Sequence, residues 1–89
     1  MITEEEKNII KKYADEFKVK EVYLFGSSLN DSATARDIDL AVKGIAPSLF
    51  FRFYGKLIKY LPKPVDLVDL DDDSPSANLI MKEAVKVYG

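Results

Sequence analysis

The stretch from Val22 to Val42, VYLFGSSLNDSATARDIDLAV, decides the fold of this chain. One apolar run ends at Gly26, and the next begins around the pair Asp37 and Asp39. Successive side chains in a strand alternate between its two faces, so these two carboxylates project from one face, with Cα atoms roughly 6.5–7 Å apart. At that spacing they repel by roughly 2 kcal/mol at an effective dielectric near 20. A divalent cation between them would remove this cost.

The composition limits the chemistry that the chain can support. Its 89 residues predict one domain with a single small core, and they include no cysteine and no histidine. Disulfides, thiolate metal sites and Ser-His-Asp catalysis are therefore excluded, which leaves carboxylates to bind a hard cation such as Mg²⁺. The net charge of −2 argues against general nucleic-acid binding, which uses a basic surface. We expect a cytoplasmic protein without a signal peptide or membrane anchor, because no apolar run approaches the ~20 residues of a membrane span.

Hydrophobic periodicity predicts three helices and three strands. Thr3 and Glu6 form a capping box ahead of a first amphipathic helix. A second helix starts at Pro47 and ends before Pro62, and a third starts at Ser74-Pro75. The expected strands are 22–25, 38–42 and 65–70. The residues expected to face the core are Ile9, Ile10, Tyr13, Ala14 and Phe17 in the first helix, Leu49, Phe50, Phe53, Tyr54, Leu57, Ile58 and Leu61 in the second, with Phe51 semi-buried, and Ala77, Ile80, Met81, Ala84 and Val87 or Tyr88 in the third.

The predicted strand–helix–strand unit places a third carboxylate near the first two. Such a unit implies a right-handed parallel crossover, so Asp66, at the start of the third strand, joins Asp37 and Asp39 at one end of the sheet. Gly26 and Ser27, at the end of the first strand, reach that end only if this strand runs antiparallel to the second. We therefore predict a mixed sheet.

The other acidic residues near the third strand are poorer candidates for metal ligands. Asp69 is an odd number of residues from Asp66, so it is expected to face the opposite side of the sheet. The acidic run at 71–73 is typical of a solvated loop.

The bend after the first strand is a candidate site for phosphate. The missing side chain of Gly26 permits a sharp turn and the close approach of a ligand, and backbone N–H groups at Ser27 and Ser28 can bind phosphate oxygens. Arg36 either contacts a phosphate or is a solvated loop arginine.

These features resemble the nucleotidyltransferase superfamily that includes DNA polymerase beta. The family pattern is an apolar residue followed by Gly-Ser, a short spacer, an Asp-x-Asp/Glu strand and a third carboxylate on a later strand. The chain supplies Phe25-Gly26-Ser27, Asp37-Ile38-Asp39 and Asp66. It is similar to the minimal, stand-alone nucleotidyltransferases that are often paired with a HEPN-domain protein. The resemblance implies a single domain over 1–89 with an α+β, two-layer fold, in which helices pack on a small mixed β-sheet.

The resemblance also implies an activity. This is the magnesium-dependent transfer of a nucleoside monophosphate, AMP from ATP, to a hydroxyl group, with a tyrosine of a HEPN-domain toxin as acceptor and the chain as its antitoxin. A pair of Mg²⁺ ions, replaceable by Mn²⁺, is implied as cofactor. Asp66 would bind the ion nearest the acceptor and accept the hydroxyl proton. The implied catalytic and metal-binding residues are Asp37, Asp39 and Asp66, and the implied nucleotide-binding residues are Gly26, Ser27, Ser28 and Arg36.

Two alternatives stay open. Many relatives carry Arg or Tyr soon after Gly-Ser, where this chain has Ser28 and Leu29, and this departure favours an antitoxin that masks its partner by binding without turnover. The other alternative is a homodimer that modifies a small molecule such as an aminoglycoside in a pocket at the subunit interface.

Overall fold

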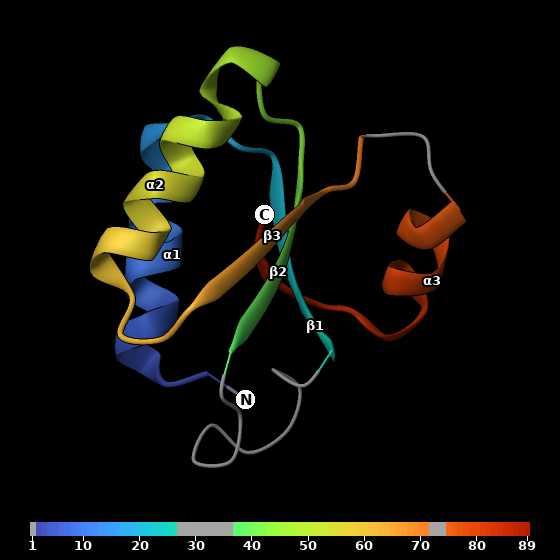
Figure 1. The fold of residues 1–89 in the computed structure, drawn as a ribbon, viewed down its shortest axis with the longest axis horizontal. Coiled ribbons are helices and arrows are strands. Elements are labelled where there is room, and N and C mark those ends of the chain that lie inside the picture. Colours follow the sequence, from blue (N-terminus) through green and yellow to red (C-terminus); the bar gives the residue numbers. More distant parts are fainter. Residues whose placement is uncertain (1, 27–36, 72–74) are drawn as a thin grey trace.

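A four-stranded β-sheet forms the centre of the protein, with its strands in the order β3-β2-β1-β4 (Figure 1). The computed structural model describes residues 2–26, 37–71 and 75–89. Within these ranges, no helix combines the length and apolar character needed to cross a membrane. In chain order the elements are α1 (Glu4–Glu16), β1 (Glu21–Phe25), β2 (Ile38–Lys43), the 3₁₀ helix η2 (Pro47–Leu49), α2 (Phe50–Tyr60), β3 (Val65–Asp69), α3 (Pro75–Glu83) and β4 (Val85–Tyr88).

Helix α1 begins with the predicted capping box. The backbone N–H of Glu6 donates to Thr3 Oγ1 at 3.1 Å, and the backbone N–H of Thr3 donates to Glu6 Oε1 at 2.8 Å. These two bonds satisfy backbone donors that have no partner inside the helix. They also explain why Glu6, at 3% exposed, is a buried acid in the helix.

The sheet is mixed, as predicted. Strand β1 runs antiparallel to β2, so that Phe25 pairs with Asp39, whereas β2 runs parallel to β3. The pairing of β2 with β3 begins at the first residue of β2, where the backbone N–H of Ile38 donates to the carbonyl of Pro64 at 2.8 Å. The α+β fold and the mixed sheet expected from the sequence are therefore confirmed.

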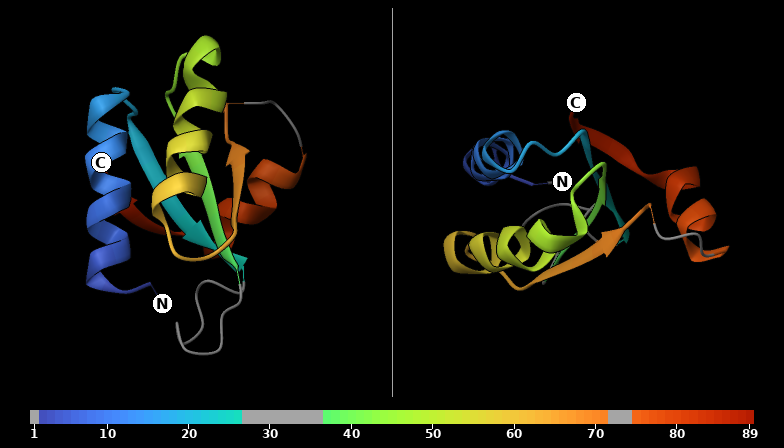
Figure 2. Two further views of the ribbon diagram at one scale, coloured as in Figure 1. Left: turned by 60° about the vertical axis from the view of Figure 1, so that its left-hand side comes forward. Right: turned by 90° about the horizontal axis from the view of Figure 1, so that it is seen from above.

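The hydrophobic core lies between one face of the sheet and the helices α1 and α2, which lie side by side over it (Figure 2). Ile10 of α1 and Phe53 and Leu57 of α2 are fully buried there. Two ring contacts join the helices: Tyr13 stacks on Tyr60 with centroids 5.3 Å apart, and Phe17 meets Phe53 edge-on at 5.8 Å. Helix α3 lies on the other side of the sheet (Figure 2).

The C-terminal segment corrects one prediction. Val87 and Tyr88 were expected to extend the last helix, but α3 ends at Glu83 and Val85–Tyr88 pairs antiparallel with β1. The alternating sequence VKVY favours a strand, and without it β1 would be an edge strand with unpaired backbone groups. The ion pair between Lys86 and Glu21, at 3.0 Å, spans this pairing, and the hydrogen bond from Lys86 holds the pKa of Glu21 below its ordinary value.

Helix α2 corrects a second prediction, because its apolar residues are not all buried. Phe51, predicted to be semi-buried, is 80% exposed, and Ile58, predicted to face the core, is 56% exposed. A helix that packs on one sheet and one neighbouring helix buries only one of its faces, and in α2 this buried face is centred on Phe53 and Leu57. On α3, Met81 is likewise 40% exposed, although it was expected to face inward.

The contrast between the two phenylalanines of α2 gives a test of this packing. Phe53→Ala should lower the free energy of unfolding by roughly 3–5 kcal/mol, because it removes a fully buried ring and leaves a cavity. The matched variant Phe51→Ala should change the stability by less than about 0.5 kcal/mol, as is usual for surface positions. Urea denaturation followed by circular dichroism measures both, and equal losses of stability would contradict the packing described here.

Candidate active site

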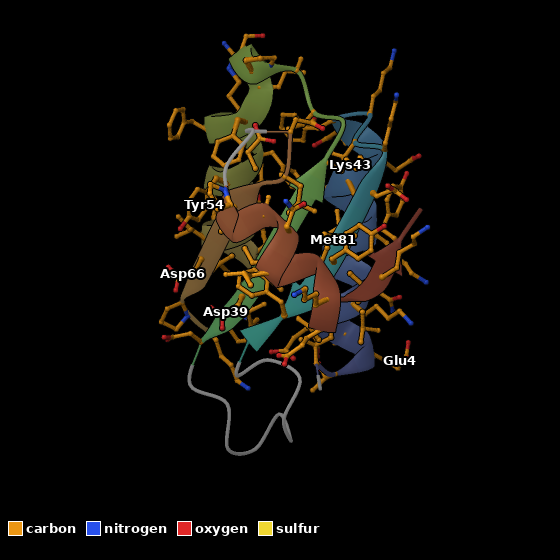
Figure 3. The ribbon with its side chains drawn as sticks, turned by 90° about the vertical axis from the view of Figure 1, so that its right-hand side faces the viewer. Glu4, Asp39, Lys43, Tyr54, Asp66 and Met81 are labelled. Atoms are coloured by element: carbon orange, nitrogen blue, oxygen red, sulfur yellow. The ribbon has the colours of Figure 1, made fainter. Side chains whose placement is uncertain are left out.

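Asp39 and Asp66 face each other across the parallel pair formed by β2 and β3. They are direct partners in the strand register, and neighbouring strands lie about 4.8 Å apart. Ile38 and Leu40, on either side of Asp39, are at most 2% exposed and face the core. The two carboxylates therefore share the face of the sheet that points away from α1 and α2. Figure 3 shows them next to each other near one end of these strands.

Asp37 immediately precedes β2 and is exposed at the same end of the sheet. The three predicted acids therefore lie at the same end of the sheet, and two of them, Asp39 and Asp66, are register partners. In the described part of the chain, however, no three acidic side chains are placed so that they could hold a metal ion among them. Asp37, Asp39 and Asp66 therefore do not form a ready-made three-carboxylate cage.

The end of β1, at Gly26, lies directly against Asp39. The φ of Gly26 is +63°, a value that favours glycine, and a Cβ built at Gly26 would lie 2.6 Å from Asp39 Oδ2. The preceding residue, Phe25, is the register partner of Asp39. The bend after β1 and the carboxylate of Asp39 are therefore in close contact. The other predicted phosphate-binding residues, Ser27, Ser28 and Arg36, lie outside the residues that the structure describes.

Asp69 belongs to the other face and the other end of β3. It pairs in register with Val42, a fully buried core residue, so it lies on the face of the sheet opposite Asp66, as predicted. Its Oδ1 accepts a hydrogen bond from the backbone N–H of Asp71 at 2.9 Å. Asp69 therefore does not belong with the carboxylates at the start of the strands.

Asp71 has a structural role that the sequence did not reveal. Its Oδ2 accepts a hydrogen bond from the backbone N–H of Gly44 at 2.7 Å and so ties the end of β3 to the turn after β2. The sequence predicted only a solvated acidic loop here, and Asp72 and Asp73 lie outside the described residues. A single acid in an acidic run carries no signal of this bond, because its partner is a backbone group 27 residues away.

The donor set at this edge suits a hard cation that binds together with a phosphate ligand. Magnesium prefers oxygen ligands and usually keeps several waters, so it is bound by one or two carboxylates plus substrate phosphates. A pair of acids next to a glycine fits that requirement, whereas Ca²⁺ takes six to eight oxygens. The geometry is therefore compatible with a metal that arrives with a nucleoside triphosphate, and it does not require a preformed cage.

Comparisons with known proteins agree with this geometry. Residues 7–89 match the family model described as "Polymerase beta, Nucleotidyltransferase". No curated protein matches the chain significantly in sequence. Among solved structures, the toxin–antitoxin MntA-HepT is 27% identical with a TM-score of 0.71, and the match covers 94% of this chain and 70% of that one.

Two further structures are similar to the same extent. A toxin–antitoxin with AMP-PNP is 27% identical, with a TM-score of 0.71 and coverage of 93% of this chain and 73% of that chain. The tri-AMPylated Shewanella oneidensis HEPN toxin in complex with MNT antitoxin gives 27% identity, a TM-score of 0.71 and coverage of 94% and 70%. On the strength of the family match over 7–89, this chain belongs to the DNA polymerase beta-type nucleotidyltransferase family.

Proposed function

We propose that the protein is an antitoxin enzyme that transfers AMP from ATP to a tyrosine hydroxyl of a HEPN-domain toxin. The observation that carries this proposal is the register pairing of Asp39 with Asp66 beside the Gly26 bend. The solved relatives support a HEPN toxin as the acceptor and an adenine nucleotide as the donor, because one holds a tri-AMPylated HEPN toxin with its MNT antitoxin and another holds AMP-PNP.

Each of the clustered residues has a role in this proposal. Asp37 and Asp39 would hold Mg²⁺, and Asp66 would hold Mg²⁺ on the side of the acceptor. When bound, Mg²⁺ supplies charge that stabilises the attacking and leaving oxygens of the phosphoryl group. Gly26 keeps the space beside Asp39 free of side-chain atoms, so that a triphosphate can approach the backbone there.

The proposed reaction is an in-line substitution at the α-phosphorus of ATP. The tyrosine oxygen forms a bond to that phosphorus, the bond to the oxygen bridging the α- and β-phosphates breaks, and pyrophosphate leaves. The phenol has an ordinary pKa near 10, so a base must take its proton as the bond forms. Asp66 is exposed at the sheet edge, where an incoming protein side chain can reach it, and the chain contains no histidine to do this instead.

Nucleotide binding can be tested with two aspartates of the same strand. With MgATP at ten times its dissociation constant, the wild-type protein should gain about 1.4 kcal/mol, or roughly 5–10 °C in melting temperature. Asp66→Asn should lose most of this gain. The matched control Asp69→Asn should keep it, because Asp69 lies on the opposite face and asparagine can still accept the hydrogen bond from Asp71. Differential scanning fluorimetry measures the shifts, and an equal shift in both variants would place the nucleotide elsewhere.

Catalysis can be tested by incubating the protein with labelled ATP, Mg²⁺ and a HEPN-domain partner. We expect label on a tyrosine of the partner, located by mass spectrometry, and a loss of at least about 100-fold in rate for Asp39→Asn. Asp69→Asn serves again as the control and should transfer AMP at the wild-type rate. Full neutralisation of the toxin by Asp39→Asn, with no label transferred by the wild type, would instead identify an antitoxin that acts by binding alone.

A further inference from the structure

The outward face of α2 carries an unusual set of residues. Phe51, Gly55 and Ile58 follow one another at spacings of four and three residues, so they line one side of the helix. Phe51 is 80% and Ile58 56% exposed, and Gly55 is exposed between them. We call these three residues the α2 stripe. Single exposed apolar residues are common, whereas two large ones on the same side of one helix favour an interaction surface.

Within the residues that the structure describes, no close contact requires a glycine at position 55. A Cβ built at this position would meet no other atom within 4 Å, so the fold leaves ample room for a side chain. Glycine in the interior of a helix costs roughly 0.5–1 kcal/mol relative to alanine. The glycine leaves a flat patch between two apolar side chains. Because the distance between packed helices depends on the side chains at the contact, a second helix can approach α2 closely at this patch. The α2 stripe therefore has the shape of a helix-docking surface.

A basic edge runs along one side of the α2 stripe. Arg52, Lys56 and Lys59 follow at helical spacing next to it, and α2 contains no acidic residue. This concentration of positive charge contrasts with the net charge of −2 of the whole chain. A second copy packing through the same helix would bring two basic edges into one interface. The charge therefore favours a partner with acidic residues beside its apolar contact.

A surface hollow of about 500 Å³ lies next to Phe51, at the N-terminal end of the α2 stripe. Its apolar walls are Ile45, Pro47, Phe50 and Phe51, and Asp69 and Asp71 also line it. This hollow can take a bulky apolar side chain of a docked helix, in the way that anchor residues fill pockets at interfaces. It lies away from Asp39 and Asp66, which are on the opposite face of the sheet and at its other end.

We propose that the α2 stripe docks an amphipathic helix of a partner protein, with acidic residues flanking the apolar ridge of that helix. That this partner is the toxin that presents the acceptor tyrosine rests on the proposed function. Docking on α2 leaves the carboxylate pair on the other face of the sheet open to ATP. The C-terminal end of α2 leads through 61–64 directly to β3, so a partner on α2 also lies close to the end of the sheet that carries Asp66.

The experiment uses two designed helical peptides as probes of the full chain. Both carry leucine at i, i+3, i+4 and i+7, but one has glutamate and the other lysine at the flanking positions. Fluorescence anisotropy should show binding of the glutamate peptide at least about tenfold tighter than of the lysine peptide, a difference of ~1.4 kcal/mol. Equal binding of the two peptides, or no binding of either, would overturn the proposal.

Variants locate the binding surface. Gly55→Leu should weaken binding of the glutamate peptide at least about tenfold without lowering the melting temperature, because the new side chain meets nothing in the fold and leucine favours a helix. Phe51→Ala should weaken it as well. Leu79→Ser on α3, at a residue 64% exposed, is the control and should bind like the wild type. Unchanged binding to Gly55→Leu would overturn the proposal, as would a wild-type dimer in sedimentation that Gly55→Leu converts to a monomer.

The two proposals fail in different ways. Asp66→Asn should lose the stabilisation by MgATP and keep the peptide, because the two sites lie on opposite faces of the sheet. Loss of peptide discrimination in a protein that still responds to MgATP would overturn only the docking surface. A wild-type protein that binds the glutamate peptide but gains nothing from MgATP would support the docking surface and contradict the proposed function.

Discussion

The parallel pairing of β2 with β3 is the constraint on which the rest of the site depends. It sets Asp39 directly opposite Asp66 on one face of the sheet, and like charges directly opposite each other on neighbouring strands are destabilising. The other side of the same strands buries Ile38, Leu40 and Leu67 in the core with α1 and α2, and this burial fixes the register that sets the two acids opposite each other.

The strands thereby divide the molecule into parts with different tasks. One face of the sheet builds the core, and the other presents the carboxylates at its edge. At the opposite end, the bond from Gly44 to Asp71 holds the ends of β2 and β3 together. On the outward face of α2, Phe51 and Ile58 lie outside the core and are exposed. The core, the carboxylate pair and the exposed side of α2 therefore occupy separate parts of one small domain.

The sequence predicted those features that depend on neighbours along the chain. The capping box of Thr3, the two-residue alternation of β2 and the separation of Asp66 from Asp69 follow from helical and strand periodicity. Predictions from the sequence were wrong or missing where a feature depends on contacts between residues far apart in the chain. VKVY became a strand because β1 offers a free edge, and Phe51 stayed exposed because α2 has neighbours on one side only. The contact of Gly26 with Asp39 likewise depends on the register of β1 with β2.

The most direct measurement of the central claim is the location of a paramagnetic cation by NMR. Mn²⁺ added together with a non-hydrolysable ATP analogue broadens the signals of nearby amides. The pairing of Asp39 with Asp66 beside Gly26 predicts that the amide signals of these three residues disappear first, while those of Gly44 and Asp71 at the other end of the sheet persist. Broadening centred on Gly44 and Asp71, or none at Asp39 and Asp66, would contradict the account.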